Sequence, residues 1–215
     1  MRPTDARTAI SQWRLRLARA ARWALLGALS FLLGWAIVDH LEFLDIRVPI
    51  GGSFSFYGVN LGILVAGLAY TGALGVAIWR TRLADWRRAA GFAILAMPWF
   101  TFGLNASMAA FDICWDCTFL IWFGGLVTAG AWATLAGVLL LPFLRSWLSV
   151  AWLFAASVAF GALAGGWAGA DSGRLSDSTV LYVVTAWCAV YAAAFSMTLP
   201  AARPHSGAVR NWQAE

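Results

Sequence analysis

Two cysteines stand three positions apart in the segment Cys114-Trp115-Asp116-Cys117. A C-x-x-C pair at the start of a helix can close a disulfide, exchange disulfides with a substrate, or ligate a metal. A disulfide in so small a ring gains little from loop entropy, so a purely structural role explains the motif poorly. The helix N-terminus favours a thiolate, whereas Asp112 and Asp116 oppose it. An inert disulfide, redox exchange and metal binding are the three interpretations of the pair.

Further polar residues are expected on the same side of the molecule as this pair. His40, beside Asp39 and Glu42, could join the two cysteines in one metal site. A solvated histidine at the membrane boundary is the simpler explanation of His40, and no metal site is assigned. The candidate outer-face polar cluster comprises Asp39, His40, Glu42, Asn60, Asn105, Asp112 and Asp116.

The composition excludes a soluble protein as the scaffold of these residues. Of 215 residues, 61% are hydrophobic and 12% are charged, and the mean hydropathy is +0.73. Soluble domains are about 45–50% apolar and about 25% charged, so this chain has too few charges to cover a wet surface. All 15 basic residues are Arg. Because Lys is absent, retinal or pyridoxal Schiff-base chemistry and a P-loop are excluded. The sequence predicts an integral membrane protein.

Long charge-free segments predict where the chain crosses the membrane, since a spanning helix needs roughly 17–25 apolar residues. Residues Val48–Tyr57, with a Gly51-Gly52 pair, indicate a small hairpin or irregular loop before the second span. The predicted fold is an all-α integral membrane protein, a bundle of six transmembrane helices. The predicted spans are residues 23–39, 58–79, 89–111, 118–141, 147–170 and 178–199.

The arginines predict the orientation of this bundle, because basic residues concentrate in cytoplasmic segments. One side would carry Arg2, Arg7, Arg14, Arg16, Arg19, Arg22, Arg80, Arg82, Arg87, Arg88, Arg145, Arg203 and Arg210. The other side would carry only Arg47 and Arg174. Both termini are therefore expected in the cytoplasm, in agreement with an even number of spans, and the protein is assigned to the cytoplasmic (inner) membrane. The division is a cytoplasmic segment 1–22, a membrane domain 23–202 and a cytoplasmic tail 203–215.

The first 22 residues form an Arg-rich amphipathic segment. Ala6, Ile10, Trp13 and Leu17 share one face of a helix, and arginines occupy the remaining surface. This pattern suits an interfacial helix that lies on the anionic inner leaflet and then turns into the first span. A simple positive anchor that only sets the topology explains the segment equally well.

Small residues predict where helices touch, because close backbone approach drives helix association in lipid. The fifth span carries Ser157, Gly161, Gly165 and Gly169 at four-residue intervals. Packing within the chain is the favoured interpretation of this stripe. Association with a second copy or with another membrane subunit through Gly161, Gly165 and Gly169 is the alternative.

Ionisable residues are not expected near the middle of any predicted span. Proton pumps and voltage sensors usually carry such residues. The deeper polar residues are threonines, namely Thr71, Thr128, Thr134 and Thr185. Hydrogen bonding between helices is their expected role.

The cysteine pair resembles that of quinone-coupled thiol oxidoreductases of the disulfide-bond-protein B and vitamin K epoxide reductase types. Those proteins also carry C-x-x-C at the outer end of a span, and the resemblance covers these four residues. Its implication is thiol–disulfide chemistry coupled to a quinone. Family members generally have four core spans and a second cysteine pair for relay, whereas Cys188 here falls midway along the sixth span.

Two functions follow from these patterns. The first is a non-catalytic membrane protein: a small-solute or ion channel, a permease-like protein, or a membrane subunit of a larger complex. It explains the uncharged interior and the glycine faces. The alternative is an outer-face thiol–disulfide or quinone-linked oxidoreductase that uses Cys114 and Cys117. Quinone is expected as a cofactor only under this alternative, and the lipid bilayer, not nucleic acid, is the expected partner.

Overall fold

The computed structural model describes residues 3–40, 47–49, 58–98, 118–170 and 177–200. Within these ranges the chain is helical apart from two three-residue strands, in agreement with the predicted all-α class. The elements are α1 (Pro3–His40), β1 (Arg47–Pro49), β2 (Gly58–Asn60), α2 (Leu61–Arg80), a helix over residues 86–98, α4 (Thr118–Leu140), the 3₁₀ turn η3 (Pro142–Leu144), α5 (Trp147–Ala170) and α6 (Asp177–Met197).

Among the described residues, three helices are long and apolar enough to cross a membrane. They contain the segments Gln12–His40, Trp122–Leu140 and Trp147–Trp167. The apolar segments Leu64–Arg80 and Leu181–Met197, in α2 and α6, are shorter. These lengths and compositions are those of a membrane protein.

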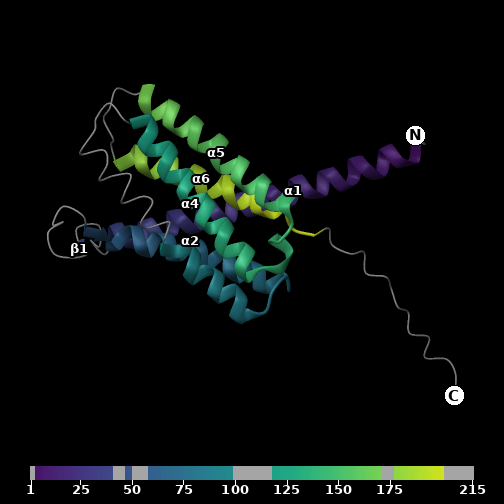
Figure 1. The fold of residues 1–215 in the computed structure, drawn as a ribbon, viewed down its shortest axis with the longest axis horizontal. Helices are drawn as coiled ribbons and strands as arrows, with labels where there is room; N and C mark the ends of the chain where they lie inside the picture. The colour runs from purple at the N-terminus through teal and green to yellow at the C-terminus, as the bar shows by residue number, and fades with distance from the viewer. Residues whose placement is uncertain (1–2, 41–46, 50–57, 99–117, 171–176, 201–215) are drawn as a thin grey trace, which may run out of the picture.

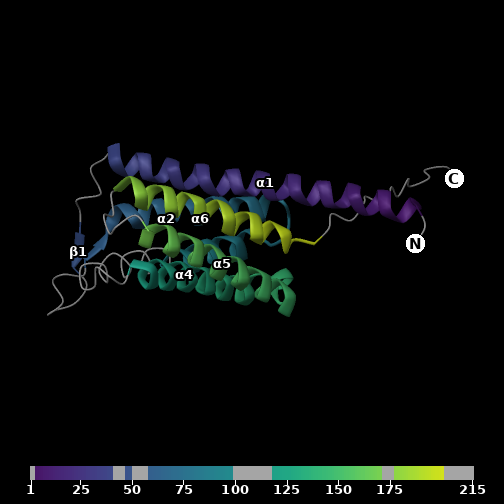
Figure 2. The same cartoon turned by 90° about the horizontal axis from the view of Figure 1, so that it is seen from above.

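The helices form an elongated bundle in which α1 packs against α2 and α6, and α4 packs against α5 (Figures 1 and 2). Helix α5 also contacts α6, which lies in the middle of the bundle (Figure 2). Helix α1 begins and α6 ends at the same end of the bundle, whereas β1 lies at the opposite end (Figure 1). The bundle therefore has two ends that carry different residues.

Helix α1 is continuous over 38 residues, from Pro3 to His40. At 1.5 Å per residue it is about 57 Å long, nearly twice the hydrocarbon thickness of a bilayer. Its first turns extend beyond the other helices, and residues 12–18 are all exposed (Figure 2). The turn expected after Arg22 is therefore wrong. No Gly or Pro interrupts residues 4–26, so nothing in the backbone breaks the helix there.

An antiparallel strand pair precedes α2, in agreement with the hairpin alternative, but its second strand covers residues 58–60 and lies beyond the predicted segment Val48–Tyr57. Strands β1 and β2 are antiparallel, with Arg47 opposite Asn60 and Pro49 opposite Gly58. The turn proposed at Gly51-Gly52 lies outside the described residues. Because residues 58–60 pair with β1, α2 begins at Leu61 and not at Gly58 as predicted.

The connection after α2 has two well-defined ends. Arg82 has a φ of 56°, in the left-handed region. The amide of Arg82 donates to Trp79 O (2.9 Å) and that of Leu83 to Ile78 O (3.2 Å), which closes α2 with a Schellman motif. Asp85 then caps the following helix, since its Oδ1 accepts from the Arg88 amide at 2.8 Å.

The small-residue stripe of α5 packs against α4 of the same chain. A Cβ at Gly165 would lie 2.8 Å from Phe119 O, and one at Gly161 would lie 3.2 Å from Val127 Cγ2. Further along, Ser157 occupies the space left by the absent side chain of Gly130. The favoured interpretation, packing within the chain, holds at Gly161 and Gly165, and association with another subunit through this stripe stays an untested alternative. Gly169 belongs to α5, but the structure does not describe its contacts.

Candidate functional site

The structure describes three of the residues predicted to carry chemistry. Asp39 and His40 end α1, and both are exposed. Asn60 ends β2 opposite Arg47. The remaining candidates lie outside the described residues: Glu42, Asn105, Asp112, Cys114, Asp116 and Cys117.

Asp39, His40 and the β1–β2 pair occupy the end of the bundle away from the start of α1 (Figures 1 and 2). The outer-face polar cluster to which Asp39, His40 and Asn60 were assigned stays a prediction. Over the described part of the chain, no three His, Cys, Asp or Glu side chains lie close enough to hold a metal ion. The predicted disulfide between Cys114 and Cys117 stays a prediction, because both cysteines lie outside that part.

A buried hydroxyl pair joins α4 to α6 in the middle of the bundle. The Thr134 hydroxyl donates to Gly130 O at 2.7 Å, one turn earlier in α4. Its oxygen lies 3.0 Å from the Tyr191 hydroxyl. The Tyr191 hydroxyl also lies 3.5 Å from Gly130 O, so both hydroxyls share this acceptor and either of them can donate to the other. Both side chains are at most 4% exposed, so this bond is shielded from water and lipid headgroups.

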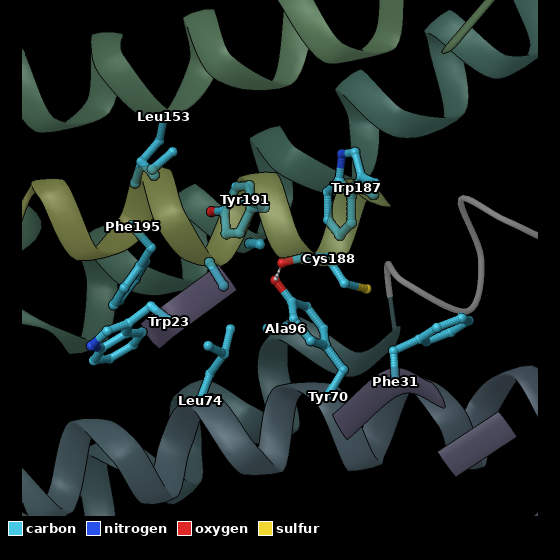
Figure 3. Close-up of a cluster of buried hydrophobic side chains, with 14 of the residues drawn as sticks. Trp23, Phe31, Tyr70, Leu74, Ala96, Leu153, Trp187, Cys188, Tyr191 and Phe195 are labelled. Atoms are coloured by element: carbon cyan, nitrogen blue, oxygen red, sulfur yellow. Dashed lines mark hydrogen bonds between the residues drawn. The ribbon is translucent and has the colours of Figure 1, made fainter. Parts of the chain in front are cut away.

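A second buried hydroxyl joins α2 to α6. Tyr70 donates to the carbonyl oxygen of Cys188 at 3.3 Å, as the dashed line in Figure 3 shows. Trp187 lies beside both tyrosines, with its ring stacked on that of Tyr191 at a centroid distance of 5.2 Å. The Cys188 side chain is fully buried and makes no disulfide. Helix α6 is thus bonded to α2 on one side and to α4 on the other.

Apolar rings fill the bundle on the side of these hydroxyls nearer the end of α6. Phe195 lies at the centre, with Trp23 and Phe92 each at a ring-centroid distance of 5.7 Å and Phe143 at 6.0 Å. Phe92 and Phe195 are at most 1% exposed. Besides the two tyrosines, the buried polar side chains of the described residues are Thr71, Thr134, Ser157 and Ser196. No Asp, Glu, His or Arg is among the fully buried side chains that the structure describes.

Sequence reasoning found Thr134 as a helix-bonding residue but missed its partner. The chain has four tyrosines, and Tyr70 and Tyr191 fall in the middle of apolar segments. A buried tyrosine hydroxyl needs a hydrogen-bond partner, so a mid-span tyrosine is itself the signal for a polar helix contact.

Arginines gather at the end where α1 begins and α6 ends. We call this surface the basic end; its described side chains are Arg14, Arg16, Arg19, Arg22, Arg80, Arg82, Arg87, Arg88 and Arg145. Arg19 is the partly buried member, and its guanidinium donates to Pro200 O at 3.2 Å and Leu199 O at 3.4 Å. It thereby ties α1 to the chain that follows α6. The remaining arginines of the basic end are exposed.

No known protein family, curated protein or solved structure matches this chain.

Proposed function

We propose that this chain is a six-span protein of the cytoplasmic (inner) membrane with both termini in the cytoplasm. The apolar helices α1, α4 and α5 support membrane insertion. The basic end supports the orientation, because nine arginines with described side chains lie there, whereas Arg47 lies in β1 at the other end. The proposed spans are those predicted from the sequence, with the second one beginning at Leu61.

Site-directed labelling with an impermeant thiol reagent tests this topology. Single cysteines are introduced into a cysteine-free variant and probed in intact cells. Positions 11, 84 and 206 should be protected, whereas positions 53 and 172 should react. Reaction at position 206 from outside would contradict the even number of spans.

Within the membrane we favour a non-catalytic role, as a subunit or partner-binding component of a larger membrane complex. The observation that carries this proposal is the filled interior. The ring of Phe195 in α6 packs against Trp23 of α1, Phe92 and Phe143. The bonded hydroxyls of Tyr70 and Tyr191 join α6 to α2 and to α4. A solute that moved along the bundle axis would have to displace these side chains, so a channel or permease is the less favoured form of the same class.

Two measurements on the full chain separate these forms. Purified protein in liposomes should give no ion or small-solute flux above that of empty liposomes. Chain extracted from native membranes in mild detergent should migrate with a mass well above its own 23.2 kDa plus detergent. Flux in liposomes, together with a monomeric mass after extraction, would overturn the proposal in favour of a channel.

The alternative proposal is a thiol–disulfide or quinone-linked oxidoreductase at the outer face, and the spacing of Cys114 and Cys117 just before α4 favours it. In that case, quinone should reoxidise the reduced pair, with two thiols giving one disulfide and the quinone becoming a quinol. Cys114→Ser and Cys117→Ser should each abolish this reoxidation, while Cys188→Ser, which removes the buried thiol, serves as the control. Reduced protein that stays reduced with excess quinone would remove this alternative.

A further inference from the structure

We propose that the basic end is a binding surface for anionic phospholipid headgroups, with Arg80, Arg82 and Arg87 as its central contacts. The inference deepens the membrane assignment proposed above and rests on it. Its test does not depend on orientation, since lipid selectivity is measured on the purified chain. A failed topology experiment and a failed lipid experiment are therefore distinguishable.

Among the side chains that the structure describes, most arginines of the basic end have no acidic partner. Asp85 is the one acidic side chain described there. It forms an ion pair with Arg88, with Asp85 Oδ2 at 3.6 Å from Arg88 Nε. No other ion pair occurs among the described side chains. Exposed guanidinium groups bind phosphate oxygens through two parallel hydrogen bonds. Because few carboxylates are described at this surface, most of its guanidinium groups are available to phosphate.

Tryptophans place these arginines at the depth of lipid headgroups. Trp79 ends α2 next to Arg80, Trp86 begins the following helix next to Arg87, and Trp147 begins α5; each is at least 52% exposed. Indole rings concentrate at the membrane–water interface, where the polar edge meets headgroups. Arg87 lies over the ring of Trp86, 5.6 Å from its centroid, so that this guanidinium is held at the same level.

The lipid-facing side of α1 changes from apolar to basic at the same level. Leu25 and Leu29 are exposed, and Arg22 lies on their helical face, three and seven residues earlier. Arg19, one turn from Trp23, is bonded to the end of α6 at this level. The basic surface is thus continuous with the apolar surface that meets acyl chains. An anionic phospholipid can contact the basic surface with its headgroup and the apolar surface with its acyl chains. A free anion can contact only the basic surface.

Arg82 provides an independent observation. It occupies the left-handed position that ends α2, where glycine is strongly preferred. A non-glycine residue there is strained, and such strain is retained where the side chain has a use. The exposed guanidinium of Arg82 beside Arg80 is that use in this proposal.

Native mass spectrometry of the full chain in detergent tests the proposal. The probes are phosphatidylglycerol, phosphatidylcholine with the same acyl chains, and inorganic phosphate. The variants are Arg82→Gly, the triple variant Arg80→Gln/Arg82→Gly/Arg87→Gln, and Arg47→Gln as a matched control at the opposite end. Thermal unfolding without lipid is measured on each variant.

Wild type should retain phosphatidylglycerol at least tenfold more tightly than phosphatidylcholine. Each basic residue near the surface is worth about 1 kcal/mol, so Arg82→Gly should weaken phosphatidylglycerol binding about fivefold and the triple variant about 100-fold. The unfolding temperature of Arg82→Gly should be unchanged or higher, because glycine relieves the backbone strain. Arg47→Gln should bind like wild type.

Three results would overturn the proposal. The first is equal retention of phosphatidylglycerol and phosphatidylcholine by wild type. The second is a triple variant that binds phosphatidylglycerol as well as Arg47→Gln does. The third is inorganic phosphate that displaces phosphatidylglycerol at comparable concentration, which would assign the surface to a free anion.

Discussion

The contact between α4 and α5 can be tested with a single methyl group. Gly165 and Gly166 are neighbours in α5, but they face different surroundings. A Cβ at Gly165 would meet Phe119 O at 2.8 Å and Phe119 Cδ2 at 2.9 Å, whereas a Cβ at Gly166 would meet nothing within 4 Å. Gly165→Ala and Gly166→Ala therefore form a matched pair with the same chemistry and the same helix, differing only in the neighbouring helix.

The expected cost of Gly165→Ala follows from the backbone oxygen. The Phe119 oxygen at 2.8 Å has to recede by about 0.6 Å to reach an ordinary contact of 3.4 Å, and it belongs to the backbone of the first turn of α4, which has to move with it. One turn earlier in α5, α4 also lies close to Gly161, where an added Cβ would meet Val127 Cγ2 at 3.2 Å and Phe123 O at 3.3 Å. Overpacking of this kind costs typically 1–3 kcal/mol. Gly166→Ala should be neutral or stabilising by up to about 1 kcal/mol, because alanine is the better helix former.

The assay is thermal unfolding of both variants in the same detergent, monitored by circular dichroism. For a chain of this size, 1 kcal/mol corresponds to roughly 2–4 °C in Tm. Gly165→Ala should thus unfold several degrees below wild type and Gly166→Ala at or above it. Gly165→Leu should fold in much lower yield than Val158→Leu, for the same reason. Equal Tm values for the two alanine variants would refute the described packing of α5 on α4.

The remaining contacts of α6 give further predictions. Gly27→Ala should destabilise the protein by about 1–3 kcal/mol, since the new Cβ would lie 2.5 Å from the carbonyl oxygen of Cys188 in α6. Gly72→Ala, which has open space around it, should not destabilise the protein. Chemical denaturation of the two variants measures the difference. In a double-mutant cycle on unfolding, Thr134→Val and Tyr191→Phe should show a coupling of about 0.6–1.7 kcal/mol, and additive effects would mean that their hydrogen bond does not form. Arg19→Gln should lower the protection of the last turn of α6 from hydrogen exchange and leave the middle of α6 unchanged, because its bonds go to the carbonyls just past that helix.

The bounds of helices were the most predictable part of this protein. Helix α5 spans Trp147–Ala170, the range predicted from the charge-free segment between Arg145 and Asp171. Such boundaries are local, because a charged side chain at a helix end is costly inside lipid wherever the rest of the chain lies. The segment before α2 was recognised as a hairpin or loop, but the pairing of residues 47–49 with 58–60 was not predicted.

The contacts between helices were much less predictable than the residues at which helices begin and end. The amphipathic pattern of residues 6–17 suggested a turn into the first span, yet α1 is straight, since helical periodicity alone does not report a bend. Thr134 was recognised as a polar residue within a span, but its partner Tyr191 comes from a helix 57 positions later. The candidate outer-face residues Cys114 and Cys117 lie outside the described part of the chain, and their chemistry stays a prediction.

The sequence by itself indicated that the chain has the composition of a membrane protein. It also predicted approximate helix ends and the end of the molecule at which the arginines gather. Those properties depend on composition and on order along the chain, which hydropathy and charge report directly. Only the tertiary structure showed that Gly161 and Gly165 face α4 and that Arg82 has a left-handed backbone conformation. It also showed that Tyr70 joins α2 to α6 and that Tyr191 joins α6 to α4. In lipid, apolar side chains gain little by leaving one apolar surface for another, so the pairing of helices depends on the fit of particular surfaces and hydrogen bonds. That fit is a property of residues far apart in sequence.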